Sequence, residues 1–115
     1  MQYLVLIYGE ESADDRAPTP EELAPWMEYD RILKEAGVFV AGEALMPTQT
    51  ATTIRGAGAD AVLTDGPFAE TREALGGFYL LECTDLDQAV HFGRQCPAVA
   101  YGSVEVRPVM DFSGM

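Results

Sequence analysis

Apolar residues predominate on both alternating faces of two segments of the chain, residues 2–8 and 77–83. Because successive side chains of a strand point to opposite faces, such runs are typical of β-strands that are covered on both sides. Residues 38–45 form a further apolar run, and residues 103–109 alternate valines with charged side chains. We therefore expect four strands at these positions.

Two helices are predicted between these strands. The first begins with Thr19 as N-cap and Pro20 at the first helical position, and it ends at Gly37. Pro25 lies in its early part and predicts either a kink or a later start near Ala24. Its apolar stripe consists of Leu23, Trp26, Met27 and Leu33.

The second helix is predicted after Asp85, which can cap it while Gln88 occupies the reciprocal position of a capping box. The dipeptide Cys96-Pro97 marks its end. Spacings of three and four residues give this helix one apolar face, made of Leu86, Ala89, Val90 and Gly93.

A β-hairpin is predicted between the two halves of the chain. Residues 50–55 and 61–64 are short β-prone runs joined by the glycine-rich residues 56–60. The hairpin is followed by the turn Thr64-Asp65-Gly66-Pro67-Phe68-Ala69-Glu70. Gly66 can adopt backbone conformations that other residues avoid, and Pro67 has a fixed φ, so a rigid turn is expected. This turn would hold the Asp65 carboxylate and the Phe68 ring at the end of a strand.

The order βαβ, hairpin, βαβ predicts an α+β fold of the ferredoxin-like type, a split βαβ with an inserted β-hairpin. Two helices can cover only one face of the sheet, so the second apolar face needs a partner. Pairing of two copies, sheet against sheet, predicts a homodimer in the form of a dimeric α+β barrel. The alternative is a packed monomer whose hairpin folds over the sheet.

Composition narrows the class of protein. The 115 residues, 48% of them hydrophobic, fit a single domain over residues 1–115. A formal net charge of -12 repels phosphate backbones and anionic lipids, so we expect neither nucleic acid nor membrane as a partner. The first residues lack a basic leader, and their apolar run is far shorter than the ~20 residues of a membrane span, which indicates a cytoplasmic protein.

Sequence patterns of common cofactor sites are absent. The chain has no GxGxxG, P-loop, HExxH or GxSxG motif and one histidine, so we expect no cofactor and no metal site. Cys83 and Cys96 lack CxxC spacing and are expected to be reduced and buried. His91 is expected on the outer side of the second helix, paired with Asp87 four residues earlier.

Asp65 is the first candidate for chemistry. It either bonds the backbone of its turn or serves as a ligand anchor or a base. Gly66 and Pro67 then act as scaffold, and Phe68 belongs to the core or to a pocket wall. Arg55, at the end of a hairpin strand, either binds an anionic ligand or forms a cross-strand ion pair.

Asp30 is the second candidate, because it falls within the apolar stripe of the first helix. A carboxylate in such a stripe either pairs with Lys34, four residues later, or is available as a general base. Tyr8 and Tyr79 are expected to pack in the core or to present hydroxyls to a cavity, with Trp26 as a further wall.

The turn sequence of residues 64–70 resembles that of the DGPF family, part of the YCII-related superfamily. The resemblance extends to the opening residues 1–9, to Gly76-Gly77-Phe78-Tyr79 and to Val104-Glu105-Val106-Arg107-Pro108-Val109. It implies a ferredoxin-like dimeric α+β barrel with a pocket near the turn. The His-Asp pair proposed for enzymes of the wider superfamily is not matched, because the first helix has no histidine.

Two functions follow as hypotheses. The first is a cytoplasmic homodimer that binds a small organic molecule between sheet, first helix and hairpin, with a cofactor-free proton-transfer or lyase-type step. Asp65 and Asp30 are its acids, and its ligand-binding residues are Gly66, Pro67, Phe68, Tyr8, Trp26 and Arg55. The second is an acidic, non-enzymatic interaction module. The family resemblance links it to transcriptional regulation, because relatives are often encoded beside extracytoplasmic-function sigma factors.

Overall fold

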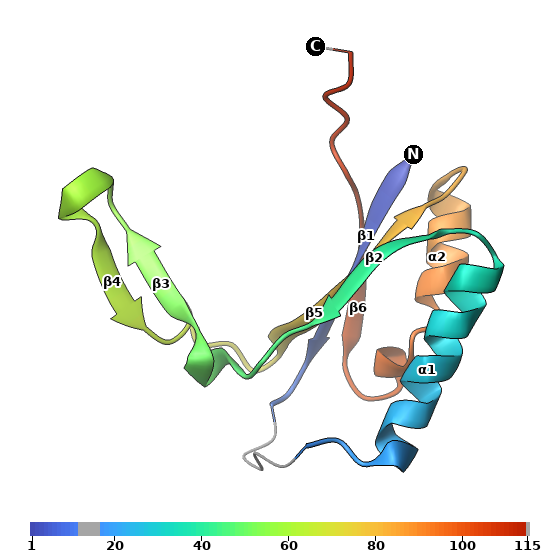
Figure 1. Cartoon of the computed structure of the whole chain (residues 1–115), viewed down its shortest axis with the longest axis horizontal. Helices are drawn as coiled ribbons and strands as arrows, with labels where there is room; N and C mark the ends of the chain where they lie inside the picture. The colour runs from blue at the N-terminus through green and yellow to red at the C-terminus, as the bar shows by residue number, and fades with distance from the viewer. Residues whose placement is uncertain (12–16, 115) are drawn as a thin grey trace.

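The structure is a computed structural model that describes residues 1–11 and 17–114. The polar, proline-containing sequence of residues 10–20 predicts a loop that leads to the first helix, and this loop lies partly outside the described residues. Figure 1 shows the elements in chain order. They are β1 (Gln2–Gly9), α1 (Pro20–Glu35), β2 (Phe39–Ala44), η1 (Thr48–Thr50), β3 (Thr52–Arg55), η2 (Gly58–Asp60), β4 (Val62–Asp65), β5 (Ala74–Glu82), α2 (Leu86–Gly93), η3 (Pro97–Ala100) and β6 (Ser103–Pro108).

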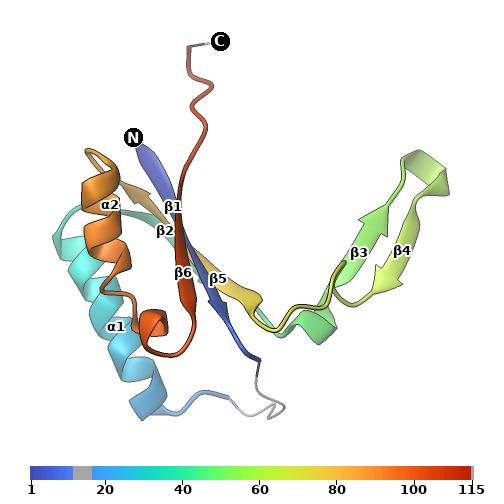
Figure 2. The same cartoon turned by 180° about the vertical axis from the view of Figure 1, so that it is seen from behind.

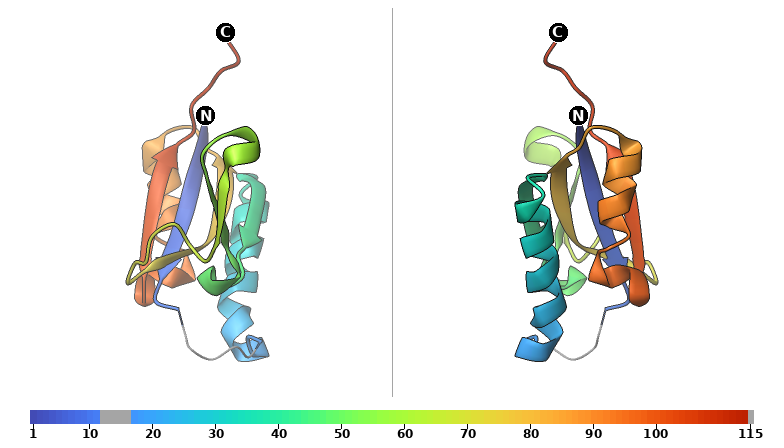
Figure 3. Two further views of the ribbon diagram at one scale, coloured as in Figure 1. Left: turned by 90° about the vertical axis from the view of Figure 1, so that its left-hand side faces the viewer. Right: turned by 90° about the vertical axis from the view of Figure 1, so that its right-hand side faces the viewer.

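Four strands form an antiparallel sheet in the order β2-β5-β1-β6, and β3 pairs with β4 in a separate hairpin. Both helices lie on one face of the four-stranded sheet (Figure 3). This order, with one helix after β1 and one after β5, is that of a ferredoxin-like split βαβ fold. The predicted fold class and the inserted hairpin are confirmed.

The core lies between this sheet and the helices. Tyr3, Val5 and Leu81 of the sheet are buried there, together with Tyr29 and Leu33 of α1. Leu4, Leu6, Phe78 and Leu80 alternate with the buried strand residues and belong to the opposite face of the sheet. We call this second side the open face, because no helix of the described chain covers it (Figure 3).

Helix α1 turns a different stripe inward than the one predicted. Leu33 is buried and Trp26 partly so, but Met27 is 70% exposed. Tyr29 takes the inward position, where its hydroxyl donates to the Phe92 carbonyl at 2.9 Å. Its ring also meets the Tyr79 ring edge-on at 5.2 Å. The stripe was predicted from hydropathy, on which tyrosine is less hydrophobic than methionine. In the structure, Tyr29 is buried because its ring packs in the core and its hydroxyl finds a hydrogen-bond partner there.

The predicted start of α1 is confirmed. Thr19 is the N-cap, and its hydroxyl accepts from the Glu22 N–H while the Glu22 carboxylate accepts from the Thr19 N–H. Pro20 is the first helical residue, so the alternative start near Ala24 is wrong. Pro25 lies within the helix.

Helix α2 differs from the prediction in three details. Asp85 caps it as expected, but the Gln88 amide oxygen accepts from the Thr84 N–H at 2.7 Å instead of completing a box with Asp85. The helix ends at Gly93 rather than at Cys96-Pro97, where the turn η3 begins. Its inward residues are Ala89, Phe92 and Gly93, whereas Leu86 is half exposed.

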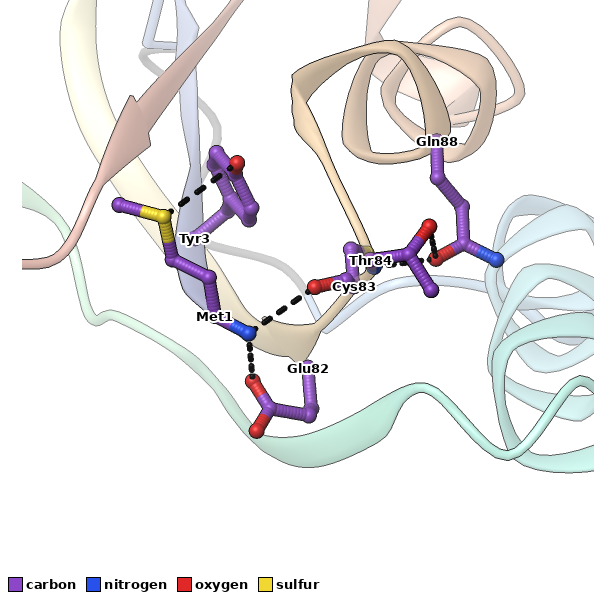
Figure 4. Close-up of polar contacts among 6 residues, drawn as sticks. All are labelled: Met1, Tyr3, Glu82, Cys83, Thr84 and Gln88. Atoms are coloured by element: carbon purple, nitrogen blue, oxygen red, sulfur yellow. Dashed lines mark hydrogen bonds and ion pairs between the residues drawn. The ribbon is translucent and has the colours of Figure 1, made fainter.

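The chain start is tied to the end of β5 and to Cys83, the residue that follows it (Figure 4). The Met1 ammonium donates to the Cys83 carbonyl at 3.0 Å and lies 3.1 Å from a Glu82 carboxylate oxygen. The Tyr3 hydroxyl donates to the Met1 sulfur at 3.6 Å. Cys83 and Cys96 are free and buried, as predicted. In the described ranges, no helix is long and apolar enough to cross a membrane.

The β3–β4 hairpin, residues 52–65, projects from the body on the side of the sheet opposite the helices (Figures 1 and 2). We call it the arm. Its strands pack on each other and form no extended contact with the four-stranded sheet. The radius of gyration is 16.3 Å, above the roughly 13 Å of a compact chain of this length. The alternative in which the hairpin folds over the sheet of its own subunit is therefore wrong.

Candidate functional site

A half-open cavity of about 570 Å³ lies between α1 and one end of the sheet. This volume is in the range of small-molecule sites. The end of β1, the end of β2, the start of β5 and the first half of α1 form its walls. Its lining residues are Ile7, Tyr8, Gly9, Glu10, Glu11, Pro18, Leu23, Trp26, Asp30, Gly42, Glu43, Ala44, Leu45, Met46, Pro47, Ala74, Gly76, Gly77, Tyr79 and Tyr101.

Asp30 brings a carboxylate to this cavity from α1. One carboxylate oxygen lies 2.7 Å from the Lys34 ammonium, which confirms the predicted pair of residues four apart on the helix. Because the side chain is only partly exposed and lines the cavity, it remains within reach of a bound molecule. Asp30 therefore forms the predicted ion pair and also lines the cavity, and its role as a general base stays a prediction.

Tyr79 of β5 lines the same cavity as Asp30. Its ring is held edge-on by Tyr29 and by Phe39, with centroid distances of 5.2 and 6.3 Å. Burial, helped by the negative charge of Asp30, raises the pKa of Tyr79 to about 12. The hydroxyl has no hydrogen-bond partner among the described residues, so it is a protonated donor available to a ligand.

The position of the Tyr79 ring depends on Gly42 of β2. A Cβ atom at Gly42 would lie 2.7 Å from Cδ1 of Tyr79, closer than side-chain carbons approach one another. Gly42 thus lets the ring occupy the cavity wall. A glycine inside a strand signals such close approach, and this is the feature of the sequence that could have indicated the wall.

The lining is acidic. Its described residues include the carboxylates of Glu10, Glu11, Asp30 and Glu43, and none of the described lining residues is a lysine or an arginine. Glu10 lies 2.7 Å from Arg72, and Glu11 accepts from the N–H of Thr48 at 2.8 Å and from its hydroxyl. These contacts tie the segment after β1 to the two segments that connect the arm to the sheet.

Tyr8 lines the cavity, but its hydroxyl donates to a Glu105 carboxylate oxygen at 3.3 Å. Glu105 alternates with the inward-packed Val104 and Val106, so it lies on the open face. The Tyr8 hydroxyl is therefore directed away from Asp30. Glu105 also pairs with Arg107 on its own strand, at 2.6 Å.

The DGPF turn lies at the foot of the arm, outside this cavity. The Gly66 N–H donates to the Ala51 carbonyl at 2.7 Å, and the Thr53 hydroxyl donates to the Gly66 carbonyl at 2.8 Å. Gly66 has a φ of +99°, which only glycine adopts readily. Within the described chain the Asp65 carboxylate forms no hydrogen bond, so the turn is held by backbone groups and by Thr53.

The structure thus divides the predicted site residues into two groups. Tyr8, Trp26 and Asp30 line the cavity, whereas Phe68 is 76% exposed. Residues predicted for the site that do not line the cavity are Arg55, Asp65, Gly66, Pro67 and Phe68. The prediction included neither Gly42, Glu43 nor Tyr101, which do line it.

The remaining candidates lie elsewhere. His91 is exposed, and its Nε2 lies 3.2 Å from the Gln95 amide nitrogen, so its partner is Gln95 rather than the predicted Asp87. Across residues 1–11 and 17–114, no three histidine, cysteine or acidic side chains are placed to hold a metal ion together.

Comparison with known proteins agrees with this geometry. The sequence profile of the YCII-related domain matches residues 1–113. The chain belongs to the YCII-related domain family. The uncharacterised protein R00369 of Rhizobium meliloti (strain 1021) is 37% identical over 114 residues, which cover 95% of this YCII-related chain and 92% of the relative. The match spans α1, the sheet and the arm together.

Proposed function

We propose that this YCII-related domain binds a small organic molecule in the cavity between α1 and the sheet. The observation that supports the proposal is the pairing of a carboxylate, Asp30, with a free phenol, Tyr79, in a cavity that also contains Trp26. Ligand sites combine apolar and aromatic walls with a few convergent polar groups in this way.

The charge of the lining narrows the ligand class. Among the described lining residues, four have carboxylates and none has a cationic side chain, so these residues disfavour an anionic ligand. A neutral or positively charged molecule is favoured, and the indole of Trp26 can contact either an apolar group or an organic cation.

The two polar groups support a cofactor-free proton transfer. An ionised Asp30 can take a proton from a ligand carbon or heteroatom, and the C–H or X–H electron pair then remains on the ligand. The Tyr79 hydroxyl can donate a hydrogen bond to the oxygen on which that charge develops.

The homodimer is part of the same proposal. The open face presents Leu4, Leu6, Phe78 and Leu80 side by side, and an apolar patch of this kind is usually an interface. A two-fold pair of subunits would place the two open faces against each other.

Thermal-shift screening of uncharged and amine-bearing small molecules tests the binding site. A ligand at 100 times its Kd stabilises the folded state by about 2.7 kcal/mol, which raises the Tm of a domain of this size by several degrees. We expect Asp30→Asn and Tyr79→Phe each to weaken binding of any hit at least tenfold.

Asp65→Asn is the matched control, since it makes the same change of charge outside the cavity. We expect it to bind as the wild type does. Loss of binding in Asp65→Asn with retention in Asp30→Asn would transfer the site to the DGPF turn. A library without any hit would contradict the proposal.

A further inference from the structure

The arm carries an apolar pair that its own subunit leaves exposed. Ile54 of β3 and Leu63 of β4 are direct cross-strand neighbours, so their side chains share one face of the hairpin. They are 64% and 65% exposed. Val62 pairs with Arg55 and lies on the other face of the hairpin.

An isolated two-stranded hairpin is marginally stable in water, because two strands bury too little apolar surface to offset the entropy of ordering them. In the described part of the chain, the arm is a sheet of two strands, and no helix makes an extensive contact with it. A second surface must therefore meet it for the hairpin to persist.

The position of the arm identifies that surface. The arm stands on the open-face side of the sheet, with the helices on the far side (Figures 1 and 3). Any body that covers the open face therefore lies beside the arm. A partner on this side of the sheet can therefore contact both the open face and the arm.

Area supports the same conclusion. Four strands about 4.8 Å apart, each contributing about six residues at 3.3 Å, make a face of roughly 400 Å². A stable interface usually buries about 800 Å² on each partner. The flat outline of the open face is smaller than this, so contact with the arm would add to the area that a dimer buries.

Continuity with the proposed dimer points to a second copy as the occupant. The open face is the surface proposed above as the homodimer interface, and the arm stands on the same side of the sheet (Figures 1 and 3). The body that covers the open face in that dimer is a second copy of the chain, so the same copy is the one that the arm can meet.

We infer that in the homodimer each arm reaches across to the partner subunit and packs its Ile54–Leu63 pair against that subunit. The inference rests on the homodimer proposed above. Two-fold symmetry then gives two equivalent arms, one from each subunit, that together enclose the paired sheets.

Sedimentation velocity of Ile54→Asp over a range of concentrations tests the arm. Each dimer loses two buried apolar side chains, so we expect the dimer Kd to rise at least 100-fold. Val62→Asp is the matched control, since it adds the same charge to the same hairpin at a site 61% exposed on the other face. We expect its Kd within threefold of the wild-type value.

The variant Leu80→Asp, on the open face, distinguishes a failure of the arm inference from a failure of the dimer proposal. A wild-type chain that stays monomeric at all concentrations overturns both proposals. A wild-type dimer that Leu80→Asp dissociates, while Ile54→Asp and Val62→Asp behave alike, overturns the arm inference alone. Thermal melts of each variant report whether its body remains folded.

Hydrogen exchange gives a second measurement on the unaltered chain. We expect protection of the backbone amides of residues 52–55 and 62–65 to increase with protein concentration, in parallel with dimer formation. Protection that does not change while the dimer forms would show that the arm does not contact the partner, and it would overturn the inference.

Discussion

At the scale of single residues, Tyr29 connects more of the molecule than any other described side chain of α1. It is 1% exposed, its hydroxyl bonds the Phe92 carbonyl at the end of α2, and its ring supports Tyr79 in the cavity wall. The two helices and the candidate site are thereby joined through one buried phenol. Burial raises the pKa of Tyr29 well above its ordinary value of 10.0.

This burial predicts a loss of stability at alkaline pH. Burial also raises the pKa of Tyr79, to about 12, so the folded chain holds both phenol protons more tightly than the unfolded chain does. Unfolding releases these protons above pH 10. We therefore expect the free energy of unfolding to be unaffected by the two phenols below pH 10 and to fall as pH rises from 10 toward 12.

Urea unfolding across this pH range, with phenolate absorbance followed in parallel, measures the effect. Tyr29→Phe should reduce the slope of stability against pH, and at neutral pH it should cost about 1 kcal/mol for the lost hydrogen bond to Phe92. An unchanged slope in this variant would mean that Tyr29 is not the group that resists ionisation.

At the scale of elements, helix starts depend on neighbouring residues. Thr19 and Glu22 satisfy each other's backbone N–H groups at the start of α1, and Asp85 caps α2. Both caps were predictable because their partners lie three residues away. The inward faces of the two helices were not predictable from the sequence. Tyr29 and Phe92 face inward because they pack on the sheet and contact each other.

Thr19→Ala tests the α1 cap. The loss of a capping hydroxyl leaves the Glu22 N–H without its partner, and we expect the free energy of unfolding to fall by about 1 kcal/mol. Chemical denaturation measures it. Thr52→Ala, at an exposed threonine of the arm, should change stability by only a few tenths of a kcal/mol. Equal losses in the two variants would count against the cap.

At the scale of the whole molecule, charge opposes the association that the open face favours. Each copy has a formal charge of -12, so two copies repel each other at low ionic strength. The apolar open face and the arm must overcome this repulsion. Salt screens the repulsion and leaves apolar contacts largely unaffected.

Dimer formation is therefore expected to strengthen with salt. Between 0.01 and 0.1 M NaCl the Debye length falls from about 30 to about 10 Å, and we expect the dimer Kd to fall at least tenfold. Sedimentation equilibrium at both salt concentrations measures this. A Kd that rises with salt would indicate an interface dominated by ion pairs rather than by apolar side chains.

The candidate site was predictable where it depends on strand and helix patterning. Asp30 and Trp26 belong to the stripe of α1, and such a helix lies against the sheet, so their place in the cavity follows. Asp65 does not line this cavity, because its turn lies at the foot of the arm. No local sequence pattern predicts that the segments on either side of the hairpin direct the arm away from the body.

What the sequence determined by itself is the set of elements, their order and the ferredoxin-like plan, because caps, turns and alternation act between residues a few positions apart. The tertiary structure decided which helix residues face the core, which acid reaches the cavity, and that the hairpin leaves its own sheet uncovered. These outcomes depend on contacts between residues far apart in the chain, such as Tyr29 with Phe92 and Gly42 with Tyr79. Such contacts have no local signature.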